Sequence, residues 1–115
     1  MSSFTELIDI YITQYDSFDV GKISFDCDYG ELTFLKTNNT ADFILYAIYV
    51  VPLHRNQGYC RSILHHMIDN AFRGGFTSIW VQSVLSKVLY EYLERFEYNG
   101  HRFQHTKHGF LYKLT

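Results

Sequence analysis

The chain has 115 residues, of which 47% are hydrophobic and 18% aromatic, and this composition predicts one folded domain over residues 1–115 with a single core. Its formal net charge of −2 offers no broad attraction to nucleic acid or to an anionic membrane, so we expect neither as a partner. The first residues lack the pattern of a signal peptide and no apolar run approaches ~20 residues, which predicts a soluble, intracellular protein of the cytoplasm.

Residues 3–15 are predicted to form a helix. Apolar residues recur there at the spacing that places them on one helical face. Ser2 or Ser3 can cap the first turn, and Glu6 stands where it completes a capping box. We expect this helix to cover a sheet.

Two antiparallel strands are predicted next, over residues 20–29 and 31–36, because apolar and polar residues alternate in both. Residues 28–31 are the expected turn, in which Gly30 can take a positive φ. The expected inward side of the first strand consists of Val20, Ile23, Phe25, Cys27 and Tyr29.

The apolar run from Phe43 to Val51 predicts a buried strand, which Pro52 stops. A short loop containing Gly58 follows, and a helical pattern begins at Arg61. A strand, a glycine-containing loop and a helix direct free backbone N–H groups at the head of the helix, where these donors and the helix dipole can hold an anion. We therefore expect a phosphate-bearing ligand here.

The helix after this loop is predicted over about residues 61–72, and Gly74 and Gly75 end it with an αL cap. Residues 77–83 predict a further strand. The expected buried stripe of the helix consists of Ile63, Leu64, Met67, Ile68, Ala71 and Phe72.

A last helix is predicted over residues 86–98, stopping at Asn99 and Gly100. A terminal hairpin over residues 101–105 and 110–114 is expected to follow, with its turn at 107–109. The expected inner stripe of the last helix consists of Val88, Leu89, Tyr92, Leu93 and Phe96.

The loop carries Val50-x-Pro52-x-x-Arg55-x-x-Gly58-x-Cys60. This pattern resembles the acyl-CoA-binding motif of the GNAT family of N-acetyltransferases, V-x-P-x-x-[RQ]-x-x-G-x-[GA], with Cys60 in place of the last Gly or Ala. The resemblance implies an α/β (α+β) fold with a mixed, mostly antiparallel central sheet flanked by helices, here shortened at the N-terminus. It also implies acetyl-CoA as co-substrate and no metal.

In the resembled family, backbone amides of this loop grip the CoA pyrophosphate, and the edge of the preceding strand pairs with the pantetheine arm. The strand predicted at 77–83 would splay from the central strand and leave a V-shaped gap for that arm. The residues that this implies for cofactor binding are Ile48, Tyr49, Val50, Arg55, Asn56, Gln57, Gly58, Tyr59, Cys60 and Arg61.

A tyrosine on the family's later helix often protonates the departing sulfur. The segment Leu89-Tyr90-Glu91-Tyr92-Leu93 is similar to that region. The family's Leu-Tyr letters favour Tyr90, the inner stripe favours Tyr92, and counting back from Gly100 leads to Phe96, so Tyr90 and Tyr92 are the two candidates. The family's preceding asparagine is absent, with Ser83 or Ser86 nearby. On the predicted central strand, Asp42, Tyr46 and Tyr49 are poor general bases unless their pKa is shifted. His54 titrates in the right range, but a loop histidine is more often a solvated side chain, so no base is assigned.

The cysteines and histidines predict no metal centre. Cys27 and Cys60 are too few for a disulfide scaffold, so two reduced thiols are expected. Cys60 is either a thiol activated by a helix N-terminus or a small residue that fits a crowded turn. On one hairpin strand, His101 and His105 would lie ~13 Å apart, too far for one ion.

The resemblance implies an acetyl-CoA-dependent N-acetyltransferase that transfers acetyl directly to an amine of a protein, peptide or small molecule. The shortened N-terminal side implies an open acceptor cleft, suited to a protein acceptor or completed by a second copy in a homodimer. The alternative is a catalytically inactive GNAT-fold module that binds CoA or another protein. The substituted Cys60 and the unassigned base favour that alternative.

Overall fold

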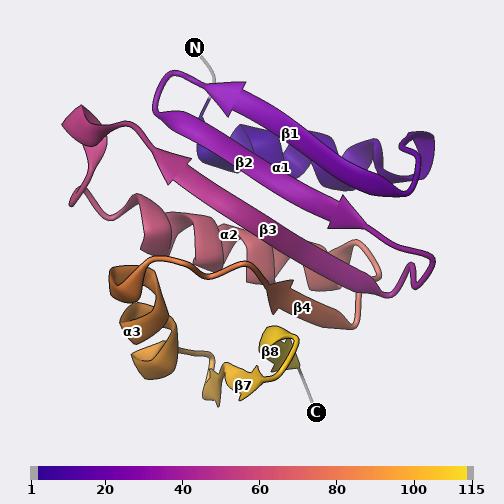
Figure 1. Cartoon of the computed structure of the whole chain (residues 1–115). Helices are drawn as coiled ribbons and strands as arrows, with labels where there is room; N and C mark the ends of the chain where they lie inside the picture. The colour runs from indigo at the N-terminus through magenta and orange to yellow at the C-terminus, as the bar shows by residue number, and fades with distance from the viewer. Residues whose placement is uncertain (1–2, 114–115) are drawn as a thin grey trace.

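A six-stranded sheet with strand order β1-β2-β3-β4-β8-β7 forms the frame of the molecule in the computed structural model, which describes residues 3–113 (Figure 1). The strands are β1 (Gly21–Cys27), β2 (Gly30–Lys36), β3 (Asp42–Val50), β4 (Ser78–Val81), β7 (Gln104–Thr106) and β8 (Gly109–Lys113), with β5 (Glu97–Tyr98) and β6 (His101–Arg102) in a separate hairpin. The helices are α1 (Phe4–Thr13), α2 (Tyr59–Arg73) and α3 (Lys87–Arg95), with short 3₁₀ turns η1 (Tyr15–Ser17) and η2 (Pro52–His54).

All strand pairs in the six-stranded sheet are antiparallel except β3 and β4, which run parallel. Helices α1 and α2 lie on the same face of the sheet, behind it in Figure 1. The predicted mixed, mostly antiparallel sheet flanked by helices is therefore confirmed.

Helix α1 packs its aromatic and aliphatic stripe against β2 and β3. The ring of Tyr11 stacks on Phe34, with centroids 4.2 Å apart and planes 6° apart, and meets Phe43 edge-on. Ser3 Oγ accepts a hydrogen bond from the Glu6 N–H (3.3 Å), as predicted for the cap, whereas Ser2 lies outside the described residues. The helix ends at Thr13, two residues earlier than predicted, because the chain tightens into η1.

The first hairpin has a two-residue turn at Asp28 and Tyr29, since Cys27 pairs with Gly30. Strand β1 places Ile23, Phe25 and Cys27 on its half-buried side, as predicted. Val20 was predicted on that side wrongly: it precedes the strand, and 59% of its surface is exposed.

A β-bulge in β3 changes which residues face the helices. Leu45 pairs with Phe34 and Ala47 with the adjacent Thr33, so Tyr46 is an extra residue without a partner in β2. Before the bulge, Phe43 and Leu45 point into the core; after it, Ile48 and Val50 pack against the core.

The prediction of a buried strand is correct only for the first half of β3. Parallel pairing with β4 ends at Leu45 and Val81. Beyond that point β3 has a neighbouring strand on one side only, and Tyr49 is 50% exposed.

The C-terminal third differs most from its prediction. Helix α3 ends at Arg95 rather than 98, because Phe96 adopts extended backbone and the chain turns back at Asn99 and Gly100 to form the β5–β6 hairpin. The single predicted terminal hairpin is in fact divided at Phe103: residues 101–102 pair with β5 and residues 104–106 with β8. Val88, predicted inside, is 78% exposed.

Candidate functional site

A cleft of about 740 Å³ lies between the second half of β3, the start of α2 and the start of α3. It opens where β3 and β4 separate: the Gln82 N–H donates to the Leu45 carbonyl (2.9 Å), and the chain then leaves the sheet for α3. Because the β2–β3 ladder uses the backbone groups on one side of β3 only, those of residues 48–50 that point away from β2 face this cleft. Its lining consists of Ile48, Tyr49, Val50, His54, Arg55, Asn56, Gly58, Tyr59, Cys60, Arg61, Ser86, Val88, Leu89 and Tyr92.

The loop before α2 turns tightly at Gly58, whose φ of 79° lies in the left-handed region that a side chain disfavours. Gly58 is the N-cap and supplies no side-chain capping bond. The first helical bond runs from the Ser62 N–H to the Gly58 carbonyl (3.0 Å), so the N–H groups of residues 59–61 lie ahead of the helical ladder. Helix α2 begins two residues earlier than predicted, and these donors form its first turn beside the cleft.

Two arginines flank the loop, and they differ in their contacts. Arg55 is folded back: its Nε donates to the Val50 carbonyl (2.9 Å), and its guanidinium carbon lies 5.7 Å from the centre of the Tyr49 ring. Arg61 is exposed on α2 and makes no ion pair within residues 3–113. Arg61 is therefore available to an anionic ligand as it stands.

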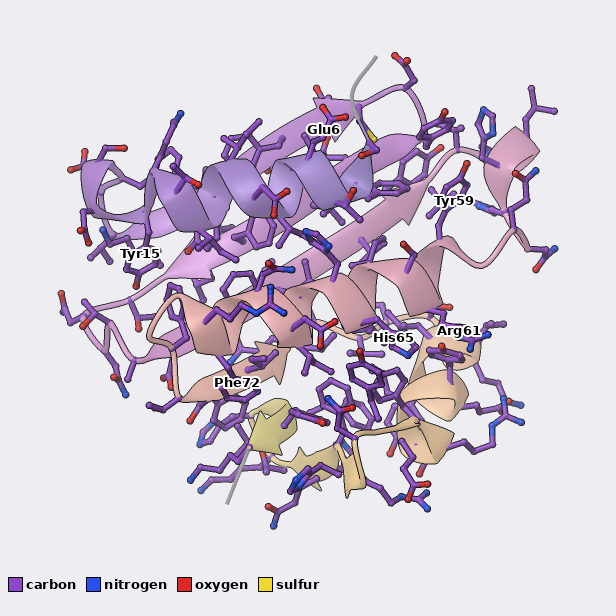
Figure 2. All side chains as sticks on the ribbon, turned by 180° about the vertical axis from the view of Figure 1, so that it is seen from behind. Glu6, Tyr15, Tyr59, Arg61, His65 and Phe72 are labelled. Atoms are coloured by element: carbon purple, nitrogen blue, oxygen red, sulfur yellow. The ribbon has the colours of Figure 1, made fainter. Side chains whose placement is uncertain are left out.

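The aromatic side of the loop is packed. The Tyr59 ring meets Phe4 edge-on, with centroids 5.5 Å apart, and stacks on Tyr29, with centroids 5.1 Å apart. His54 meets Tyr29 edge-on, with centroids 4.9 Å apart. Figure 2 shows Tyr59 projecting from the start of α2 toward α1, whereas Arg61 and His65 project toward α3. Gln57 is the one predicted loop residue that does not line the cleft; its Nε2 donates to the Leu53 carbonyl (3.4 Å).

Cys60 lies in the first turn of α2, two residues after Gly58, and packs partly buried against the core. Burial raises the pKa of its thiol to about 11, so the thiol is protonated at neutral pH. A pKa raised by burial is the opposite of what an activated thiol requires, so the structure does not support the reading of Cys60 as an activated thiol.

Tyr90 and Tyr92 occupy different environments. Tyr92 lines the cleft beside Cys60 and Arg61, and its pKa is raised, mainly by burial, so the hydroxyl keeps its proton at neutral pH. Tyr90 lies outside the cleft lining, and its hydroxyl is 3.0 Å from His105 Nδ1. The geometry places only Tyr92 where it can meet a ligand in the cleft.

Three cleft residues on the α3 side were not predicted as site residues. Ser86 caps α3 by accepting from the Leu89 N–H (3.3 Å), and Val88 and Leu89 add an apolar wall. The family resemblance pointed to the neighbourhood of Ser86 and Leu89, but it assigned neither of them a role. The exposure of Val88 (78%) depends on tertiary structure and cannot be read from a sequence.

Of the four residues considered as a general base, two lie outside the cleft lining. Asp42 stands at the far end of β3, opposite Ser78. Tyr46 projects from the bulge, with Lys22 Nζ 4.2 Å from its ring centre, and hydrogen bonding from Ser83 and then Lys22 lowers its pKa. His54 and Tyr49 are the two that line the cleft.

The histidines of the tail take part in ring contacts. His105 stacks on Phe110 with centroids 4.5 Å apart, and His101 meets Tyr112 edge-on at 6.0 Å. Among residues 3–113, no group of three or more His, Cys, Asp or Glu side chains is placed to hold a metal ion. In the same part of the chain, no helix has the length and apolar character needed to cross a bilayer.

Comparisons with known proteins agree with this geometry. The sequence model of the acetyltransferase (GNAT) family matches residues 20–98. In sequence, no curated protein gives a match.

Solved structures share the fold at low sequence identity. The PaiA N-acetyltransferase of Thermoplasma acidophilum, solved in complex with coenzyme A, is 12% identical with a TM-score of 0.55, over 93% of this chain and 67% of that one. An acetyltransferase from Bacillus cereus is 19% identical with a TM-score of 0.53, over 95% and 90%. Tetrahymena GCN5 is 11% identical with a TM-score of 0.54, over 96% and 86%.

Proposed function

The chain belongs to the acetyltransferase (GNAT) family, and from this premise we propose that it transfers an acetyl group from acetyl-CoA directly to an amine of a protein, peptide or small-molecule acceptor. The observation that carries the proposal is the cleft itself. It brings together a strand edge with no neighbouring strand, the N–H groups of a helix start and a protonated tyrosine.

The start of α2 is suited to the pyrophosphate of the co-substrate. The N–H groups of Tyr59, Cys60 and Arg61 and the positive end of the helix dipole favour an anion there. Asn56 and Gly58 line the same end of the cleft, and Gln57 is the remaining loop residue proposed to contribute its N–H. Arg55 would have to leave the Val50 carbonyl to reach a phosphate oxygen.

The edge of β3 is suited to the pantetheine arm. Ile48, Tyr49 and Val50 line the cleft, and backbone groups on this edge point away from β2. An extended chain carrying amides can bind such an edge in the way that a strand does. Val88 and Leu89 face it with apolar surface.

When bound, acetyl-CoA supplies an acetyl group activated as a thioester. Transfer to an amine needs a proton for the sulfur that leaves, and we propose that Tyr92 supplies it. A tyrosine hydroxyl is protonated at neutral pH, as a proton donor must be, and burial moves the pKa of Tyr92 further in that direction. Tyr90, the other candidate, would have to leave His105 and move to reach the cleft.

The acceptor is proposed to approach an open site. In the described part of the chain, α1 and α2 share one face of the sheet, and Figure 1 shows no helix across the other face. Such openness suits a protein or peptide amine, or a wall completed by a second copy of the chain.

Calorimetric titration with acetyl-CoA tests the site. We expect micromolar binding that a Gly58→Trp variant abolishes. Gly75→Trp is the matched control: Gly75 also has a positive φ (95°) with open space around it, but it lies at the opposite end of α2. Absence of binding to the unmodified chain, or equal loss in both variants, would contradict the proposal.

Release of free CoA thiol in the presence of a panel of amines then tests transfer. With an acceptor in hand, Tyr92→Phe should lower kcat by about 100-fold, the range expected for loss of a general acid, while acetyl-CoA binding persists. Tyr90→Phe should leave kcat near that of the unmodified chain. Binding without transfer to any amine would favour a CoA-binding module instead.

A further inference from the structure

The six-stranded sheet has two unlike edges. At one edge β7 has only three residues, and so short a strand offers little backbone to another chain. At the other edge β1 has seven residues, contains no proline and pairs with β2 without a bulge (Figure 1). Shortness, prolines and bulges are features that keep an edge strand from pairing with another chain. Because β1 has none of them, its outer edge is suited to such pairing.

Every second residue of β1 directs its backbone N–H and C=O groups away from the sheet. The Val51 N–H donates to the Tyr29 carbonyl (2.9 Å), so Tyr29 bonds toward β3 and the next residue, Gly30, turns its backbone groups toward β1. Gly30 is paired with Cys27, which therefore directs its own groups toward β2. Since successive residues of a strand alternate, the backbone groups of residues 22, 24 and 26 point outward.

The side chains of β1 on the face without helices carry opposite charges near its two ends. Lys22 and Asp26 are both exposed, and neither forms an ion pair within residues 3–113. Asp26 stands directly opposite Glu31 of β2, and like charges in such a pair are unfavourable. The Lys22 ammonium lies 4.2 Å from the centre of the Tyr46 ring. Each charge therefore lacks a counter-charge in its own chain.

The sequence of β1 is complementary to itself when it is reversed about Ser24. In an antiparallel pair of two such strands centred there, Lys22 of one copy stands opposite Asp26 of the other. On the opposite face Ile23 stands against Phe25, so apolar surface meets apolar surface. The outward backbone groups are also arranged symmetrically about Ser24 and meet as hydrogen-bonded pairs. A two-fold interface requires this kind of self-complementary patch.

Helix α1 presents an exposed apolar residue beside the same edge. Ile10 is 38% exposed. Ile12 lies against the end of α2, since a Cβ added at Gly74 would be 3.1 Å from its Cγ2. Residues two apart on a helix point in nearly opposite directions, so Ile10 faces away from α2 and toward the β1 side. A second copy paired along β1 would bring the two α1 helices side by side and cover Ile10 of each.

We propose that the chain forms a homodimer in which β1 pairs antiparallel with β1 of a second copy, in register about Ser24, so that one sheet runs through both copies. A second copy fits this edge better than an unrelated strand because β1 itself supplies both charges of each pair. The inference does not depend on the proposed acetyl transfer. No residue of β1 lines the cleft, and β2 separates β1 from the cleft strand β3, so both clefts stay open in the dimer.

Sedimentation equilibrium over a range of concentrations tests the dimer. The mass of the unmodified chain should approach twice 13.6 kDa as the concentration rises. Lys22→Glu and Asp26→Lys should each weaken the dimer by at least about tenfold, because each variant places like charges opposite each other twice. The double variant Lys22→Glu/Asp26→Lys restores opposite charges and should dimerise as tightly as the unmodified chain.

Ser24→Pro removes the central outward N–H, and an edge strand tolerates proline where its N–H faces solvent, so this variant should fold and remain monomeric. Circular dichroism checks its fold, and the charge variants decide the question if it does not fold.

Lys107→Glu is the matched control, since it makes the same charge change at an exposed position in the turn between β7 and β8, and it should leave the dimer unchanged. The mass of one chain at every concentration would overturn the inference. A dimer that the single charge variants leave equally tight, or that the double variant fails to restore, would overturn it as well.

Discussion

Replacing Tyr11 by phenylalanine is expected to stabilise the protein. Tyr11 is fully buried, and its hydroxyl has no hydrogen-bond partner among residues 3–113. Burying a hydroxyl without a partner costs about 1–3 kcal/mol, and phenylalanine fills the same space without that cost. The ring contacts with Phe34 and Phe43 persist in the variant. We expect a gain of about 1 kcal/mol in the free energy of unfolding.

Tyr112→Phe is the matched control. Tyr112 is equally buried, but its hydroxyl donates to the Tyr98 carbonyl at 2.6 Å, so the variant leaves a carbonyl without its donor. We expect a loss of about 1–2 kcal/mol. For 115 residues, an unfolding entropy of about 2.1 cal/mol/K per residue converts 1 kcal/mol into about 4 °C of Tm.

Differential scanning calorimetry should therefore show Tm rising by about 4 °C in Tyr11→Phe and falling in Tyr112→Phe. A fall of similar size in both would refute the reasoning, because it would mean that the Tyr11 hydroxyl has a partner, such as an internal water.

The pH dependence of stability supplies a second measurement on Tyr11. Burial, and then the neighbouring Tyr15, raise the pKa of Tyr11 above the value of about 10 in an unfolded chain. Above pH ~10 the unfolded chain binds fewer protons than the folded one, so stability falls as pH rises. In Tyr11→Phe this fall should be shallower. An unchanged slope would show that Tyr11 ionises as readily in the folded protein as in the unfolded chain.

Three further substitutions or reactions have expected outcomes. Gly30→Ala should lower the free energy of unfolding by about 3 kcal/mol or more, because Gly30 has a φ of 154° and an added Cβ would lie 1.8 Å from the Tyr49 carbonyl oxygen. A denaturant titration measures this loss, and an unchanged midpoint would contradict the contact. At pH 8, Cys60 should react with iodoacetamide about 100-fold more slowly than a free thiol, because a pKa of about 11 leaves little thiolate. Mass spectrometry of the alkylated peptides measures the rate, and a rate equal to that of glutathione would contradict the prediction. Lys36→Met should lower the free energy of unfolding by about 2 kcal/mol, because the Lys36 ammonium donates to the carbonyls of Tyr15 (2.7 Å) and Phe18 (2.8 Å). A Tm equal to that of the unmodified chain would argue against these bonds.

Local signals in the sequence were sufficient to predict the loop before α2 and most of α2 itself. Pro52 ends the strand, Gly58 permits a left-handed backbone, and apolar residues at helical spacing continue to Ala71. These features act through φ and through hydrogen bonds between near neighbours, so they can be recognised without the rest of the chain. The error of two residues at the helix start arose because Tyr59 and Cys60 have no capping side chain before them to mark the boundary.

The position of Tyr92 in the cleft was decided by tertiary structure. Tyr90 and Tyr92 are separated by one residue, and helical spacing allowed either to face the ligand. The choice depends on the tail, because His105 and Phe110 hold the Tyr90 side chain, and those residues reach it only through β7 and β8. No pattern local to α3 contains that contact.

By itself, the sequence determined the order of strands and helices as far as α3, the glycine loop and the resemblance to an acyl-CoA-binding motif, because these depend on neighbouring residues. Tertiary structure alone decided the rest. The bulge at Tyr46 exchanges the two faces of β3, and it is defined by pairing with β2. A groove of about 520 Å³ is lined by Arg61 on α2 and Arg95 on α3, and only the tertiary fold brings these positions, distant in sequence, to one surface.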